Sequence, residues 1–209
     1  MKKFILTEAK ESKKVVIYLP GISGDVFNQK YDVFPELFKE AGFCFLRYNF
    51  WHNRVEFSQL SISSIHQELD KVIYYLKEKG FTEISLLGKS FGGGIALAYR
   101  NPEVKSMVLW SQAFGIEESG TIREWINKPL QGFKSTLNIS FDKKFFQDLI
   151  IPIGLLHGTL DEKVPPENSK KLLKILLQAN LVILPATKHS NNLNLVAKEA
   201  INFLNIKND

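Results

Sequence analysis

The sequence predicts an α/β fold in which a mostly parallel central sheet carries helices on both faces. Two observations lead to this prediction: short apolar runs typical of buried strands alternate along the chain with amphipathic helical patterns, and glycines stand where helices are expected to end. The chain has 209 residues, of which 44% are hydrophobic and 23% are charged, so it can bury a substantial core. We therefore expect a single domain over residues 1–209, with functional side chains at the carboxyl ends of strands.

The first half of the chain contains three of the expected strands. Apolar runs predict them over 15–19, 43–48 and 84–87. A helix is expected over 35–41 and is ended by Gly42. A longer amphipathic helix begins near Ile62, where apolar residues recur every three or four positions, and is ended by Gly80.

The second half continues the alternation. Strands are predicted over 106–110, 151–156 and 181–184. Helices are predicted over 94–100, 167–178 and 193–204. The regular order of strand and helix is what indicates a parallel sheet covered on both sides.

The segment Gly88–Gly92 reads Gly-Lys-Ser-Phe-Gly and has the form of a nucleophile elbow. It lies directly after the strand predicted over 84–87 and directly before the helix-prone residues 94–100. A sharp turn from strand to helix holds the serine in a strained, exposed position, and the flanking glycines remove the Cβ atoms that would clash there. Ser90 is therefore the candidate nucleophile.

An acid and a histidine follow two later strands. Asp161 lies in the loop after the strand predicted over 151–156, and His189 lies after the strand predicted over 181–184. The chain order is then Ser, Asp, His, which is the order of the α/β-hydrolases and differs from the two other common serine-hydrolase orders. All three residues follow strand ends, where loops can converge on one site.

The sequence resembles the α/β-hydrolase superfamily over nearly the whole chain, from Val15 to the last predicted helix. The segment His157–Pro165, which reads His-Gly-Thr-Leu-Asp-Glu-Lys-Val-Pro, is similar to the acid-bearing loop of that superfamily, especially of its small dienelactone-hydrolase-like and carboxylesterase members. The resemblance implies the α/β-hydrolase fold with a short lid insertion. It also implies a serine hydrolase that cleaves carboxylic esters or thioesters of a small acyl substrate.

In the expected mechanism, Ser90 attacks an acyl carbonyl while His189 takes its proton. Asp161 holds the imidazole in the required tautomer, and Glu162 beside it is the fallback acid. Water activated by the same histidine then releases the acid from the acyl-enzyme.

The other histidines are weaker candidates for the base. His157 belongs to a strand-end His-Gly turn, and His66 lies within the amphipathic helix. Trp51 and His52 lie in the loop over 50–54, near the expected mouth of the site, and are candidate substrate contacts. The alternative for His52 is an exposed loop residue without a role.

The oxyanion hole requires two backbone N–H donors. The first is expected from Phe91, whose amide follows the nucleophile at the start of a helix. The resemblance implies Ile22 as the second, although this chain has Pro20-Gly21 where His-Gly is more usual in the superfamily. Ser23 can either add a hydroxyl donor or stabilise the turn.

The regular pattern weakens over residues 111–148, where the superfamily carries its lid. Glycine and proline interrupt this stretch, and its scattered aromatic residues include Trp125, Phe133, Phe141, Phe145 and Phe146. Those aromatics either contact substrate or fill a core beneath the loop. A lid of this length leaves an open site, which favours small or medium acyl groups.

The remaining composition argues against several classes of protein. The net charge of +5 and pI near 9.1 arise from lysines dispersed among acidic residues, so we expect no nucleic-acid binding. Polar residues interrupt the N-terminal apolar run too early for a signal peptide, and no run is long enough to span a membrane, which makes a cytoplasmic location the expectation. Cys44, the only cysteine, lies in an apolar run and is expected to be a small buried hydrophobe.

No cofactor or metal is expected. Gly88-Lys89-Ser90 imitates the end of a phosphate-binding loop, but the first glycine of that motif is replaced by Glu83. The glycines after Ser90 lack the spacing of a dinucleotide-binding motif, and no Cys/His cluster suggests zinc.

Two classes of function remain. The first is the serine esterase or thioesterase, with peptidase, lipase, acyltransferase and perhydrolase activities as variants that share the same triad. The second is an α/β-hydrolase-fold protein that has lost turnover and serves as a binding module. The intact set of Ser90, Asp161 and His189 favours the enzyme. The sequence carries no signal for an oligomeric state or for a role of Lys89.

Overall fold

The computed structural model of the chain describes residues 4–24, 26–51, 60–116, 122–124, 146 and 148–206. Its strands are β1 (Phe4–Thr7), β2 (Lys14–Leu19), β3 (Cys44–Tyr48), β4 (Glu83–Lys89), β5 (Val104–Trp110), β6 (Phe114–Ile116), β7 (Ile122–Glu124), β8 (Ile153–Gly158) and β9 (Ala179–Leu184). Its helices are the 3₁₀ turn η1 (Gln29–Tyr31) and α1 (Val33–Glu40), α3 (Ile62–Glu78), α4 (Phe91–Ala98), α6 (Glu167–Leu173) and α7 (Leu193–Ile206).

Seven strands form the central sheet in the order β1-β3-β2-β4-β5-β8-β9. The edge strand β1 runs antiparallel to β3, and the other neighbouring pairs are parallel. A separate pair, β6 and β7, is antiparallel. This arrangement confirms the predicted α/β class, and the sheet is mostly parallel.

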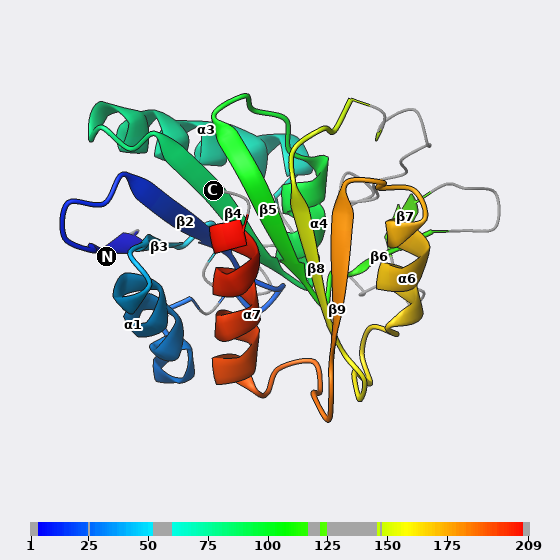
Figure 1. Ribbon diagram of the computed structural model, residues 1–209. Helices are drawn as coiled ribbons and strands as arrows, with labels where there is room; N and C mark the ends of the chain where they lie inside the picture. Colours follow the sequence, from blue (N-terminus) through cyan, green and yellow to red (C-terminus); the bar gives the residue numbers. More distant parts are fainter. Residues whose placement is uncertain are drawn as a thin grey trace.

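Helices cover both faces of the sheet. Helices α1 and α7 pack side by side on one face, and α3, α4 and α6 lie on the other (Figure 1). The central strand β2 shows why: Val15 and Ile17 enter the core beneath α3 and α4, whereas Val16 and Tyr18 enter the core beneath α1 and α7. A strand buried on both faces must be apolar at every position, which is the pattern of an inner parallel strand.

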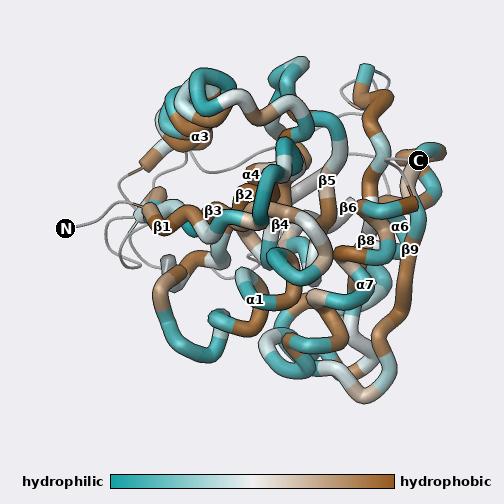
Figure 2. Tube along the Cα trace, turned by 60° about the vertical axis from the view of Figure 1, so that its left-hand side comes forward, coloured by the Kyte–Doolittle hydropathy of each residue, from teal (hydrophilic) through white to brown (hydrophobic). Residues whose placement is uncertain are grey.

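Local signals explain the clearest helix. In α3, Ser61 caps the first turn: its side chain accepts from the amide of Ser64, whose hydroxyl in turn accepts from the amide of Ser61. The apolar stripe faces the sheet, and Figure 2 shows hydrophilic and hydrophobic residues both present on this helix. Gly80 follows the helix with φ +83°, a conformation that glycine adopts without strain.

Several elements differ from the sequence expectation: β1, β6 and β7 were not predicted, the helix expected over 94–100 spans Phe91–Ala98, and α6 is shorter than expected. β1 was not anticipated, because a half-exposed edge strand of four residues carries little pattern of its own. Helix α6 ends at Leu173, not near Gln178, and the chain continues in turns that bury Leu176. The side chain of Gln178 donates to the carbonyl of Leu149, a tertiary contact that the unwound end permits.

Cys44 behaves as expected from the sequence. It is 1% exposed on β3, and its sulfur accepts from the amide of Ala9 at 3.3 Å. Burial raises the pKa of the thiol, so the side chain is a small hydrophobic group in the core.

Candidate active site

Ser90 occupies a strained turn between β4 and α4. Its φ and ψ are 51° and −117°, a region that residues with a side chain rarely adopt. The backbone around it is held in place: the Ser90 amide donates to the carbonyl of Trp110 at 2.8 Å, and the Ser90 carbonyl accepts from the amide of Ala113 at 3.0 Å. The strained geometry is therefore maintained by hydrogen bonds to the end of β5 and the residues after it.

The glycines of the elbow are required by close backbone contacts. A Cβ atom on Gly88 would lie 2.6 Å from the carbonyl oxygen of Gly92, and one on Gly92 would lie 2.2 Å from the carbonyl oxygen of Leu19. No real Cβ atom tolerates such distances, which agrees with the steric reason for the motif. The same packing brings the loop after β2 against Ser90, since a Cβ atom on Gly21 would lie 4.0 Å from Ser90 Oγ.

His189 and Asp161 form a buried pair. His189 Nδ1 lies 3.0 Å and 2.9 Å from the two carboxylate oxygens, and the residues are 6% and 8% exposed. Because an ionised carboxylate can only accept, Nδ1 carries the proton, and Nε2 of a neutral ring keeps its lone pair. His189 and Ser90 line the same cavity, so the structure brings together the three residues predicted as the triad.

The carboxylate of Asp161 has further donors. Its Oδ1 accepts from the amides of Lys163 and Val164 at 3.0 Å and 2.9 Å. Burial opposes ionisation, but the hydrogen bonds from His157, His189 and the Val164 amide outweigh it and hold the pKa well below its usual range. Asp161 is therefore an anion at neutral pH. Glu162, the fallback acid, is exposed, and His189 Nδ1 is hydrogen-bonded to Asp161.

His157 has a role that sequence reasoning missed. It is fully buried on β8, with Nδ1 2.7 Å from Ser169 Oγ and Nε2 2.9 Å from the carbonyl oxygen of Val164. A carbonyl only accepts, so Nε2 carries a proton, and Nδ1 shares a hydrogen bond with the Ser169 hydroxyl. Its Nε2 also lies 3.4 Å from Asp161 Oδ2, so His157 supports the acid loop. The available signal was its position directly after the apolar run 151–156, which β8 extends to Gly158.

The cavity that contains Ser90 and His189 has a volume of about 260 Å³. The two residues predicted to form the oxyanion hole, Phe91 and Ile22, both line it. Phe91 is the first residue of α4, where backbone amides point toward the helix N-terminus. The location agrees with the predicted role, and the donation of either amide to a substrate remains a prediction.

Trp51 packs against the loop of residues 20–24, which is predicted to supply an oxyanion donor. Its side chain is 1% exposed, and its indole N–H donates to the carbonyl of Gly21 at 3.2 Å. A Cβ atom on Gly24 would lie 2.4 Å from the carbonyl oxygen of Trp51. Trp51 thus packs against the loop after β2, which contains Ile22. The sequence analysis expected Trp51 to contact substrate, but its side chain is buried. His52, the other expected contact, lies outside the described residues.

His66 lies apart from this cavity. Its Nε2 is 3.1 Å from the carbonyl oxygen of Ile95, and its ring packs against Tyr99 between α3 and α4. Burial lowers its pKa, which favours the neutral ring. His66 is a structural residue of the helix interface.

Most of the lid expected over 111–148 falls outside the described residues, as do Trp125, Phe133, Phe141 and Phe145 among the five aromatics named above. The fifth, Phe146, is 4% exposed and belongs to the main hydrophobic core. For this one residue the structure supports the alternative that the aromatics fill a core.

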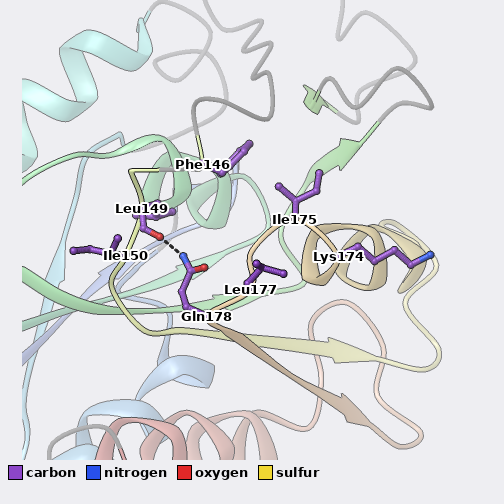
Figure 3. Close-up of a pocket in the computed structure, with 7 residues that line it drawn as sticks. All are labelled: Phe146, Leu149, Ile150, Lys174, Ile175, Leu177 and Gln178. Atoms are coloured by element: carbon purple, nitrogen blue, oxygen red, sulfur yellow. Dashed lines mark hydrogen bonds between the residues drawn. The ribbon is translucent and has the colours of Figure 1, made fainter.

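A second cavity, of about 570 Å³, lies at the opposite edge of the sheet. Residues directly before β8 and β9 form much of its wall, including Leu149, Ile150, Leu177 and Gln178 (Figure 3). Its lining contains none of the predicted catalytic residues. Size therefore does not identify the site, whereas the carboxyl ends of the strands do.

Within the described ranges, no group of three or more His, Cys, Asp and Glu side chains is arranged to hold a metal ion. In the described part of the chain, no helix combines the length and apolar character needed to cross a membrane.

Known structures share this architecture, although the sequence matches no protein-family model and no curated protein. Est1E from Butyrivibrio proteoclasticus is 19% identical, with a TM-score of 0.75 over 98% of this chain and 93% of its own. MenH from S. aureus is 16% identical, with a TM-score of 0.78 over 100% of both chains. MGS-MChE2, an alpha/beta hydrolase enzyme from a sediment metagenome of the Mar Chica lagoon, Morocco, is 18% identical, with a TM-score of 0.72 over 100% of this chain and 98% of its own. Identities this low concern the fold.

Proposed function

We propose, from the α/β-hydrolase fold that this chain shares with the structures above, that it is a serine hydrolase cleaving carboxylic esters or thioesters. The observation that carries the proposal is the buried His189–Asp161 pair, which borders the same cavity as the strained Ser90. Strained backbone and buried charged groups cost stability, and they concentrate where chemistry uses them.

The reaction begins when Ser90 Oγ attacks the acyl carbonyl and His189 Nε2 takes the hydroxyl proton. Asp161 stabilises the imidazolium that forms, and the amides of Phe91 and Ile22 stabilise the oxyanion. His189 then returns the proton to the departing alcohol or thiol, which leaves an acyl-enzyme. Water attacks this ester as His189 takes its proton, and His189 gives that proton to Ser90 Oγ as the second intermediate collapses and releases the carboxylic acid.

The size of the cavity suggests a small acyl substrate. About 260 Å³ lies below the usual range of pockets for drug-sized ligands, roughly 300 to 1,000 Å³. We therefore expect esters with short acyl chains to be hydrolysed faster than esters with long chains.

The proposal is tested by labelling with a fluorophosphonate, which reacts with activated serines. The wild-type protein should be labelled, and Ser90→Ala should not. Ser63→Ala removes an exposed serine on α3 and is the matched control that should retain full labelling. Hydrolysis of p-nitrophenyl esters of increasing chain length should fall by about 10³-fold or more in Ser90→Ala. Labelling that persists in Ser90→Ala, or a folded wild-type protein that is not labelled, would favour the non-catalytic binding module.

A further inference from the structure

Lys89, the residue before the nucleophile, lies in an unusual environment for a lysine. It is the last residue of β4, only 5% exposed, and it lines the cavity with Ser90 and His189. Its Nζ donates to Tyr31 Oη at 2.9 Å and to Ser190 Oγ at 2.8 Å. The ammonium also lies over the ring of Trp110, 4.6 Å from its centre. The side chain is therefore held in place by neutral groups.

The charge of this ammonium is not balanced locally. Within the described residues, no carboxylate forms an ion pair with Lys89, and Asp161 is already bonded to His189 and to two backbone amides. Burial lowers the pKa of Lys89 to about 7, and the positive charges of Lys30 and Lys163 act in the same direction. Asp161 opposes them and does not cancel their effect. A buried cation without a counter-ion is costly unless a ligand supplies the negative charge.

Lys163 adds a second cation to the same cavity. It is exposed in the loop that follows β8, between Asp161 and Val164, and it lines the cavity. The loop with Gly21 and Ile22, which follows β2, lines the same cavity. The described residues of the cavity wall include two lysines and no Asp or Glu. The wall beside Ser90 is thus positively charged.

We propose that Lys89 and Lys163 form a carboxylate-binding subsite, and that the natural substrate is a small ester or thioester whose acyl group carries a second, free carboxylate. The inference rests on the proposed hydrolase function and specifies its substrate class. The free carboxylate accepts hydrogen bonds from the ammonium groups while Ser90 attacks the ester carbonyl a few carbon atoms away. Half-esters of short dicarboxylic acids have this form and fit a cavity of about 260 Å³.

The test compares two substrates of nearly equal size, monomethyl succinate and dimethyl succinate. The wild-type protein should hydrolyse the monoanion with a kcat/KM at least about tenfold higher than the neutral diester, the ratio expected for one charge-assisted hydrogen bond. Lys89→Met should reduce kcat/KM for the monoanion at least about tenfold more than for the diester. Lys105→Met, on an exposed position of β5, is the matched control that should leave the ratio unchanged.

Two outcomes would overturn the subsite. The first is a wild-type protein that shows no preference for the monoanion, a measurement that needs no variant. The second is an equal loss for both substrates in Lys89→Met, which would show that Lys89 only positions Ser190 and the neighbouring His189. Lys163→Met should lower the preference by a smaller factor, because an exposed charge is screened by water and salt.

Binding without turnover separates this inference from the proposed function. Calorimetric titration of Ser90→Ala with succinate should show binding that is lost in Lys89→Met/Ser90→Ala. The anion favours charged Lys89, so the affinity should be highest below pH 7 and fall as the pH rises above it. Lys30, Lys163, Asp161 and His189 remain in both proteins, so the difference between them isolates Lys89. If succinate binds but the wild type is not labelled by the fluorophosphonate, the hydrolase is rejected and the subsite is retained. If the wild type is labelled but succinate does not bind, the subsite is rejected and the hydrolase is retained.

Discussion

The chain turns differently at the two ends of the parallel strands. We call the side where these strands begin the amino edge of the sheet and the side where they end the carboxyl edge. At the amino edge, Gly42 before β3 and Gly80 before β4 both adopt φ +83°, where glycine is not strained. At the carboxyl edge, Ser90, Ser111 and Ala186 follow β4, β5 and β9 with φ between 46° and 51°. These residues carry a Cβ atom, and each costs on the order of 1–3 kcal/mol in that conformation.

Glu11, in the turn before β2, is the exception at the amino edge, with φ 58°. The edges also differ in packing: a Cβ atom on Gly42 would meet nothing within 4 Å, whereas one on Gly92 would meet backbone at 2.2 Å. Strain and close packing therefore coincide at the edge that carries Ser90 and the buried acid–base pair. The larger cavity at the amino edge has neither catalytic pair nor strained serine.

The largest difference in stability between the two edges is expected when a glycine at each edge is replaced by alanine. Gly92→Ala places its Cβ atom 2.2 Å and 2.4 Å from the carbonyl oxygens of Leu19 and Pro20, which are backbone atoms that cannot move alone. We expect a destabilisation of about 3 kcal/mol or more and the loss of labelling at Ser90. Gly42→Ala suffers only from its φ angle, at about 1 kcal/mol. Urea unfolding of both variants measures the difference, and equal losses would contradict the comparison.

Removing a charge at the carboxyl edge should affect catalysis more than stability. Asp161→Asn keeps the shape of the side chain, but its amide group can donate to His189 Nδ1 and favours the wrong tautomer. We expect kcat for a p-nitrophenyl ester to fall by about 10⁴-fold while the protein stays folded. Glu162→Gln, at the exposed neighbouring position, is the matched control and should retain activity. A comparable loss in Glu162→Gln would show that the acid has been misassigned.

The same residue makes stability depend on pH. The pKa of Asp161 is lower in the folded protein than in the unfolded chain, so the ionised carboxylate stabilises the fold above about pH 4. This contribution is lost as the pH falls below that value toward the folded pKa. The stability advantage of the wild type over Asp161→Asn should therefore be constant near neutral pH and shrink in acid. Denaturant unfolding at several pH values measures this difference in the free energy of unfolding. A stability advantage of the wild type that grows as the pH falls would contradict the prediction.

The smallest effect is expected at the amino-edge cavity. Leu177 is 90% exposed in its wall, so Leu177→Lys should change the free energy of unfolding by no more than about 0.5 kcal/mol. Ester hydrolysis should stay at the wild-type rate. A clear loss of activity in this variant, with stability unchanged, would show that the two edges are coupled.

Much of the architecture could be predicted because it depends on local patterns. The strands β2, β4 and β5 are buried on both faces and mostly apolar, and α3 has a regular stripe, a cap and a terminal glycine. The elbow could be recognised from its five-residue motif, and the clash that requires Gly88 lies within that turn, whereas the clash that requires Gly92 is with Leu19 and Pro20, which are distant in the sequence. The edge strand β1 and the early end of α6 lacked such patterns, because neighbouring segments determine them.

The sequence by itself determined the alternation of strands and helices, the strained serine and the order of acid and base, because each depends on residue types at short spacing. Only the tertiary structure decided how neighbouring residues surround Ser90, Asp161 and His189. Lys89 meets Ser190 across 101 positions, and Trp51 reaches Gly21 across 30. Contacts at such separations depend on which strands become neighbours and how the loops close over them, and no local pattern encodes that arrangement.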